Sequence, residues 1–130
     1  MLDPRFSVVA SKADEWLPIK PGTDAAFLMA LIHVWLRDNK YDKKFIEQYA
    51  VGLEELRQSV KDTTPLWQEG ITGIKADKIE RIANEIYAAA PAVVIDWGHK
   101  TTTAKAEYIR TRAIAIANAL MGNVEKKGGI

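Results

Sequence analysis

The chain has 130 residues, of which 48% are hydrophobic and 27% are charged, a composition that is typical of one globular domain and excludes an intrinsically disordered protein. The net charge is +1, so the chain has no basic excess for nucleic acid, and we expect no nucleic-acid partner. Because cysteine is absent, these residues cannot form a disulfide, a thiolate zinc site or a cysteine-ligated iron–sulfur cluster.

The first elements predicted along the chain are two short apolar segments and one long helix. Residues 7–10 are compatible with a strand or a helix, and the alternation over residues 15–19 predicts a short strand. Thr23 or Asp24 is predicted to cap a helix that runs to about residue 38. This helix is apolar on nearly all sides, which predicts a central position in the fold.

The longest apolar run, over residues 25–36, is too short to cross a membrane. It contains His33 and ends at Arg37 and Asp38, whereas a membrane-spanning helix requires about 20 apolar residues. We therefore expect a buried helix and no membrane insertion. Within such a helix, His33 is predicted to be a hydrogen-bonded core residue.

The middle of the chain predicts three shorter helices. Asp42 is predicted to cap the first, the second covers residues 53–60, and Thr64 begins the third. Gly70 and Gly73 are predicted to bracket a loop after the third helix.

Two longer helices are predicted in the second half of the chain. Residues 77–90 carry apolar side chains at spacings of three and four, and Asp77 and Glu80 have the spacing of a capping box. Residues 109–120 have a similar apolar pattern, and Gly122 is predicted to close that last helix.

Residues 92–97 form the clearest predicted strand, because they are short, continuous and rich in β-branched side chains. The helix–strand–helix order predicts an α/β fold, namely a helix-rich fragment of an open Rossmann-like αβα layer with a short, mostly parallel sheet. In such a layer ligands bind beyond the carboxyl ends of strands, which places Gly98, His99 and Lys100 at a ligand-binding edge. The predicted strands are few for so many helices, so either the fold is mainly helical or strands are missing from this piece.

Three groups of residues, spread from residue 3 to residue 129, carry a resemblance to a known family. They are Asp3-Pro4-Arg5 with residues 13–14 and 17–26, residues 41–46 with residues 49–53, and residues 119–124 with Gly128 and Gly129. In this order and spacing they resemble the molybdopterin oxidoreductases of the dimethyl sulfoxide reductase type. The resemblance implies an internal fragment of a much longer catalytic subunit, in which residues 1–130 form a single domain, a piece of the molybdopterin cofactor-binding domain.

The resemblance also implies the cofactor and the partners of the parent protein. The cofactor is molybdenum bis(molybdopterin guanine dinucleotide), with tungsten as an alternative metal and an iron–sulfur cluster elsewhere in the parent chain. The implied partners are the rest of the same subunit, an iron–sulfur electron-transfer subunit and a small-molecule substrate. The implied location is the periplasm or the outer face of a membrane.

Residues 98–100 and the helix that follows them resemble the thiosulfate and polysulfide reductase branch of this family. This branch implies two-electron reduction or oxidation of a small substrate such as a sulfur oxyanion or polysulfide. Formate dehydrogenases and nitrate reductases share the same frame. The local excess of positive charge over residues 98–127 suits an anionic cofactor or a solvated helix face.

The resemblance assigns no catalytic residue and no metal ligand to this chain, but it assigns a set of cofactor-binding residues. Gly22 would let the backbone approach a ligand closely, Thr23 would open a helix with free amides, and Asp24 would accept hydrogen bonds from guanine or ribose. A plain helix cap explains the same three residues. The full set is Asp3, Arg5, Gly22, Thr23, Asp24, Trp97, Gly98, His99 and Lys100.

The other members of this set have specific expected contacts. Asp3 would hold a guanine edge or a ribose hydroxyl, and Arg5 would clamp a phosphate. Residues 97–100 would reach toward the pterin, where Lys100 would attract an anion and His99 would donate a hydrogen bond or move a proton. A surface turn and a solvated loop are the simpler interpretations of these two segments.

Two other functions are compatible with the sequence. One is a free-standing helical protein-interaction module without catalysis, which would bind a partner through Trp16, Trp35 and Trp67. The other is a small nucleotide-binding α/β protein, which would need a phosphate loop between Gly70 and Gly73.

Overall fold

The computed structural model describes residues 1–98 and 104–130, with the backbone alone at residues 104–106, and its regular elements are helices. In the described part of the chain, no helix is both long and apolar enough to cross a membrane. The elements are the 3-10 helix η1 (Ala10–Lys12) and the α-helices α1 (Asp24–Arg37), α2 (Lys43–Tyr49), α3 (Leu53–Val60), α4 (Pro65–Thr72), α5 (Ala76–Ala89) and α6 (Ala104–Met121).

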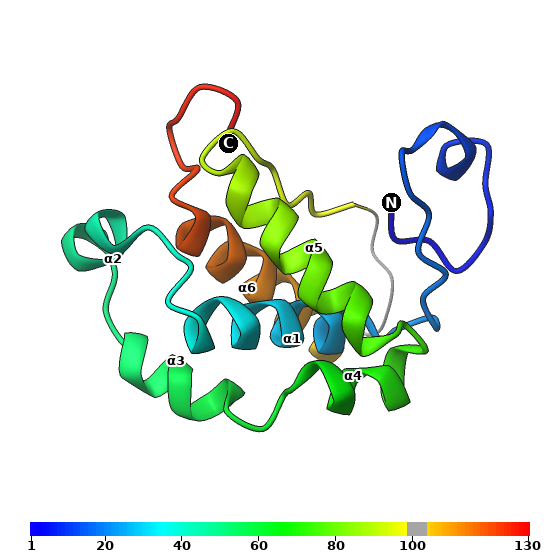
Figure 1. Cartoon of the computed structure of the whole chain (residues 1–130), viewed down its shortest axis with the longest axis horizontal. Helices are drawn as coiled ribbons and strands as arrows, with labels where there is room; N and C mark the ends of the chain where they lie inside the picture. The colour runs from blue at the N-terminus through cyan, green and yellow to red at the C-terminus, as the bar shows by residue number, and fades with distance from the viewer. Residues whose placement is uncertain (99–103) are drawn as a thin grey trace.

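Helix α1 lies at the centre of the helical part of the molecule, as its apolar sequence predicts (Figure 1). It packs against α3, α4, α5 and α6. Trp35 is fully buried, and its indole Nε1 donates a hydrogen bond of 2.8 Å to the carbonyl oxygen of Ala83 in α5. His33 is half-buried and its Nδ1 lies 2.9 Å from the Val60 carbonyl oxygen, so its predicted hydrogen bond is confirmed.

The predicted starts of α2 and α4 are confirmed, whereas the capping box predicted for α5 is wrong. The side chains of Asp42 and Thr64 each accept a hydrogen bond from the amide three residues later. Helix α5 begins at Ala76, and its amide donates to the Glu69 carboxylate of α4 over 2.9 Å. The acceptor for the start of α5 thus comes from the preceding helix, and Asp77 lies inside the first turn.

The strand predicted over residues 92–97 is wrong, because this segment runs irregularly beside α6. A strand needs a neighbouring strand to exchange backbone hydrogen bonds. Here the Asn118 side chain takes that place, accepting from the Ile95 amide at 3.0 Å and donating to the Ile95 carbonyl oxygen at 2.9 Å. The Asn123 side chain also donates to the Val93 carbonyl oxygen at 2.5 Å.

The predicted α/β layer with a mostly parallel sheet is therefore also wrong. Residues 1–98 and 104–130 contain helices and no strand, and the short strand predicted over residues 15–19 is reduced to an isolated parallel bridge between Leu17 and Leu2. The β-branched composition of residues 92–97 favours a strand only where a partner edge is available. Of the two possibilities that the sequence left open, the mainly helical fold is the one observed.

Candidate functional site

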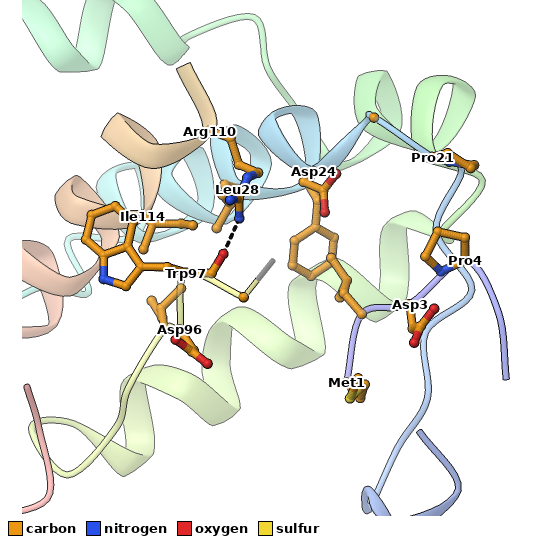
Figure 2. Close-up of a pocket in the computed structure, with 15 residues that line it drawn as sticks. Met1, Asp3, Pro4, Pro21, Asp24, Leu28, Asp96, Trp97, Arg110 and Ile114 are labelled. Carbon is orange, nitrogen blue, oxygen red and sulfur yellow. Dashed lines mark hydrogen bonds between the residues drawn. The ribbon is translucent and has the colours of Figure 1, made fainter. Parts of the chain in front are cut away.

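A pocket of about 700 Å³ opens where the N-terminal segment, the start of α1, the residues before position 98 and α6 meet (Figure 2). We call it the Asp24 pocket. Its polar lining includes Asp3, Asp24, Asp96 and Arg110, and its apolar lining includes Phe27, Leu28 and Ile114.

Several residues predicted to bind the cofactor lie together in this lining, although they come from three separate stretches of the chain. Thr23 and Arg5 are outside the lining. His99 and Lys100 lie outside the described residues. The predicted residues that the structure brings together are Asp3, Gly22, Asp24, Trp97 and Gly98.

The turn before α1 presents Asp24 to the pocket. Gly22 has a φ of 77°, in the left-handed region that side chains disfavour. The Thr23 hydroxyl donates to the Lys20 carbonyl oxygen over 2.7 Å, and the Thr23 side chain makes no capping hydrogen bond. Helix α1 therefore begins without a side-chain cap. The Ala26 and Phe27 amides donate to the Thr23 carbonyl oxygen, which leaves the Asp24 and Ala25 amides as the candidate donors to a ligand.

Asp3 is held in place by its own turn and by the adjacent parallel bridge between Leu2 and Leu17. Its carboxylate accepts hydrogen bonds from the Arg5 amide at 2.9 Å and from the Ser7 hydroxyl at 3.0 Å. The Arg5 amide, followed by the Ser7 hydroxyl, lowers the pKa of Asp3 below its ordinary value. The Trp16 indole donates to the Asp3 carbonyl oxygen at 2.8 Å. Asp3 therefore presents a fixed, ionised hydrogen-bond acceptor to the pocket.

Arg110 of α6 is a pocket residue that the sequence did not identify as one. Its side chain is nearly buried, forms an ion pair with Glu107, and donates from Nη1 to the Trp97 carbonyl oxygen at 2.5 Å (Figure 2). Its position three and four residues before the buried Ala113 and Ile114 was the available signal, because it places Arg110 on the buried side of α6.

Asp96 is the second lining residue that the sequence analysis missed. It directly follows the apolar residues 92–95, and a carboxylate at the end of such a run could have been included with the predicted edge at residues 98–100. With Asp96, the pocket has three carboxylates from three parts of the chain.

The charges of the lining determine which ligand groups suit the pocket. Asp3, Asp24 and Asp96 outnumber Arg110 among the described lining residues. Carboxylates accept hydrogen bonds and repel phosphates, so this lining suits the donor edge of a base or the hydroxyls of a sugar. Among residues 1–98 and the described part of α6, no three His, Cys, Asp or Glu side chains are grouped in a way that could hold a metal ion.

The structure changes the basis of the two other functions. Trp35 is fully buried, so it cannot contribute to the partner-binding surface predicted with Trp16 and Trp67. Gly70 lies inside α4, and Gly73 ends that helix with a φ of 83°. The predicted loop between them, and with it the predicted phosphate loop, is wrong.

The comparisons with known proteins agree with the resemblance found in the sequence. A family model described as molybdopterin oxidoreductase matches residues 1–130. The thiosulfate reductase molybdopterin-containing subunit PhsA of Salmonella typhimurium is 43% identical over 128 residues, which cover 98% of this chain and 17% of that protein. Dimethyl sulfoxide reductase DmsA of Escherichia coli is 37% identical over an aligned length of 150 residues, and the match covers 99% of this chain and 18% of that protein.

A solved structure also matches this fold. Acetylene hydratase from Pelobacter acetylenicus superposes with a TM-score of 0.76 and 33% identity, over 94% of this chain and 17% of that chain. This chain thus spans less than a fifth of the length of the relatives it matches. The family model and these identities confirm what the three groups of residues indicated, and the chain belongs to the molybdopterin oxidoreductase family.

Proposed function

We propose that this chain is the part of a molybdopterin oxidoreductase that holds the nucleoside end of a molybdopterin guanine dinucleotide in the Asp24 pocket. In this proposal the carboxylates of Asp24 and Asp3 accept hydrogen bonds from the base and the ribose. The backbone at Gly22 and Gly98 lets the ligand approach closely. The observation that carries the proposal is that three separate stretches of the chain supply these residues to one pocket.

The chemistry of the pocket supports a nucleoside in preference to a phosphate. Guanine donates hydrogen bonds from its ring N–H and its exocyclic amine, and ribose donates from its hydroxyls, so all of these groups match carboxylate acceptors. The volume of about 700 Å³ lies within the usual range for small-molecule sites. The apolar side chains of Phe27 and Leu28 give the base a surface to pack against.

The remaining residues of the predicted set belong to the proposal as contacts to the rest of the cofactor. Arg5 is exposed and follows Asp3 closely, so it is our candidate for a phosphate contact. Thr23, His99 and Lys100 complete the set of proposed cofactor contacts. Other parts of the parent subunit would supply the contacts to the second dinucleotide and the metal ligand.

For the whole protein we propose two-electron reduction or oxidation of a small substrate, with a sulfur oxyanion or polysulfide as the first candidate. The support is the 43% identity to a subunit named for thiosulfate reductase. When bound, the molybdenum centre supplies the electron and oxygen-atom transfer, and the residues of this chain hold the cofactor without reacting. The proposal includes an iron–sulfur cluster elsewhere in the chain, an iron–sulfur partner subunit and a periplasmic location.

The range of relatives supports a role in binding the cofactor and not in choosing the substrate. Proteins named for thiosulfate, dimethyl sulfoxide and acetylene all match nearly the whole of this chain. A segment shared by proteins with such different named substrates is suited to a task that they have in common. We therefore propose that residues elsewhere in the parent protein select the substrate.

The test of cofactor binding uses the full-length parent protein with Asp24→Asn. The neutral amide loses one acceptor and keeps the shape, so we expect the amount of bound guanine nucleotide to fall by about tenfold, as for a lost hydrogen bond to a charged group. The nucleotide is released with acid, identified by chromatography, and counted against the amount of protein, with molybdenum measured in parallel by mass spectrometry.

The matched control is Asp77→Asn, because Asp77 also lies in the first turn of a helix but is exposed and outside the pocket. It should leave the nucleotide content unchanged, which separates a ligand contact from a general helix-dipole effect. Equal nucleotide content in the parent protein and in Asp24→Asn would contradict the proposal.

The substrate proposal has a separate test on the same protein. With a reduced dye as electron donor, thiosulfate and polysulfide should be reduced faster than dimethyl sulfoxide or arsenate. Faster turnover of either of the last two would replace the proposed substrate and would leave the proposed nucleotide contact unaffected.

A further inference from the structure

Asn118 connects the centre of α6 to the segment that forms one wall of the Asp24 pocket. It is almost completely buried. Its Oδ1 accepts from the Ile95 amide at 3.0 Å and from Asn123 Nδ2 at 2.6 Å. Its Nδ2 donates to the carbonyl oxygens of Ile95 at 2.9 Å and Ile114 at 3.1 Å. Every hydrogen-bonding position of this amide is therefore used.

These side-chain bonds hold a segment that lacks backbone support of its own. Among the described residues, no backbone–backbone hydrogen bond joins residues 92–98 to the rest of the chain. The segment is tied to α6 by Asn118 at Ile95 and by Arg110 at Trp97, and Asn123, two residues after α6, binds it at Val93. Asn118 alone binds both the amide and the carbonyl of one residue, so it fixes the direction of the chain as well as its position.

Ile95, the residue held by Asn118, is the first residue of one wall of the pocket. Ile95 lines the pocket itself, and Asp96, Trp97 and Gly98 follow it in the lining. A small rotation of the backbone at Ile95 would turn the Asp96 carboxylate and the Gly98 backbone away from a ligand. The side of the pocket opposite Asp24 thus depends on the geometry at Asn118.

We propose that Asn118 is a positioning residue for the cofactor, acting through Ile95 on the wall formed by residues 96–98. It does not touch the ligand, and the proposal rests on the proposed function of the Asp24 pocket. The Asn118 side chain acts as a peptide group would, because its amide makes the two hydrogen bonds to Ile95 that a neighbouring strand would otherwise make.

The first experiment compares the full-length parent protein with Asn118→Leu, which is similar in size but has no polar atoms. We expect hydrogen exchange at the Ile95 amide to rise by about tenfold, as for the loss of a buried hydrogen bond, and the bound guanine nucleotide to fall by a similar factor. Exchange is followed by mass spectrometry of peptides that cover residues 92–98, and the nucleotide is counted against the amount of protein.

A second variant, Asn118→Asp, adds a readout that a general loss of packing would not produce. As a carboxylate the new side chain accepts from the Ile95 amide but faces the Ile95 carbonyl oxygen without a proton to donate. When protonated it has one O–H, which can donate to the Ile95 carbonyl oxygen in place of one of the two native donors, so nucleotide retention should rise in part as the pH is lowered. The groups that face this position, on Ile95, Ile114 and Asn123, do not titrate.

The matched control for folding is Thr63→Val. Thr63 is also buried, and its hydroxyl binds the carbonyl oxygens of Met29 at 3.2 Å and Val60 at 2.9 Å, outside the pocket lining. This variant should lose stability without losing nucleotide. If Thr63→Val lost as much nucleotide as Asn118→Leu, the role of Asn118 would be general packing and our inference would be wrong.

The remaining outcomes separate this inference from the proposed function. If Asn118→Leu speeds exchange at the Ile95 amide but leaves the nucleotide content unchanged, the positioning role is overturned. If exchange at the Ile95 amide is unchanged, the Asn118 hydrogen bonds do not hold this segment. If Asp24→Asn lowers the nucleotide content in either case, the proposed function stands and only the role of Asn118 fails. If neither variant lowers the nucleotide content, the nucleotide does not bind in this pocket and both proposals fail.

Discussion

The two ends of α1 lie in different surroundings, although the helix is apolar along most of its length. Trp35, near its C-terminal end, is fully enclosed and bonded to α5. Asp24, at its first position, is half-buried and faces a pocket formed by short irregular segments. The enclosed end is stabilised by helices that this chain supplies. The open end is positioned by polar bonds, and the Asp24 carboxylate faces the pocket there.

A buried polar network in α4 supports the turn before α1. Gln68 of α4 donates to the carbonyl oxygens of Ile74 at 2.7 Å and Pro65 at 3.1 Å, and it accepts from the Thr72 hydroxyl at 2.5 Å. The Thr72 carbonyl oxygen in turn accepts from the Lys20 amide at 3.0 Å, just before the Gly22 turn. The compact helical side therefore supports the turn that opens the pocket.

The largest effect on stability is expected at the enclosed end, with Trp35→Ala. Removing a fully buried indole leaves a cavity among α1, α5 and their neighbours, and the cost is about 3–5 kcal/mol of unfolding free energy. Urea unfolding of the 130-residue chain, followed by circular dichroism, measures this loss. Trp35→Phe is the control, because it keeps most of the ring and removes the bond to Ala83, so its loss should be clearly smaller.

The second prediction concerns the Gln68 network that supports the turn before α1. Gln68→Leu removes the partner of two buried carbonyl oxygens and of the Thr72 hydroxyl, at a cost of about 2 kcal/mol. The same urea experiment measures this change. Gln48→Leu, on the exposed side of α2, is the matched control and should change stability little. If Gln68→Leu were as mild as the control, this network would not stabilise the turn before α1.

The enclosed side of the molecule was largely predictable from the sequence. The apolar pattern of residues 24–37 predicts a central helix, and the side chains of Asp42 and Thr64 predict two helix starts that the structure confirms. These signals depend on residues close together in the chain. Local propensity and capping therefore determine them without knowledge of the rest of the fold.

The open side was predicted less well, because long-range contacts decide it. The apolar residues 92–97 favour a strand locally, but Asn118, 23 residues after Ile95, satisfies the Ile95 backbone from a helix. The grouping of Asp3, Gly22 and Trp97 was predicted from the family resemblance, since nothing in their separate spacings requires one pocket. Asp96 and Arg110 were missed because their place in the lining depends on how α6 packs.

The smallest predicted effect is a pH dependence at the C-terminal end of α1. Hydrogen bonds from Arg37, and then from Lys40, lower the pKa of Asp38 from 3.8 to about 2. Because the pKa in the folded chain is depressed, this stabilisation is fully present above pH 3.8 and is lost as the pH falls through about 2. Asp38 is partly exposed, so the contribution is under about 1 kcal/mol.

Unfolding free energies measured between pH 5 and pH 2 should therefore fall more steeply for the native chain than for Asp38→Asn. Asp62→Asn, at an exposed position, serves as the control and should keep the native slope. Equal slopes in the native chain and in Asp38→Asn would mean that the ion pairs of Asp38 do not stabilise the fold. In that case the enclosed end would depend more on apolar packing and on the Trp35 hydrogen bond, and its contrast with the polar, ligand-facing end would be sharper than these ion pairs suggest.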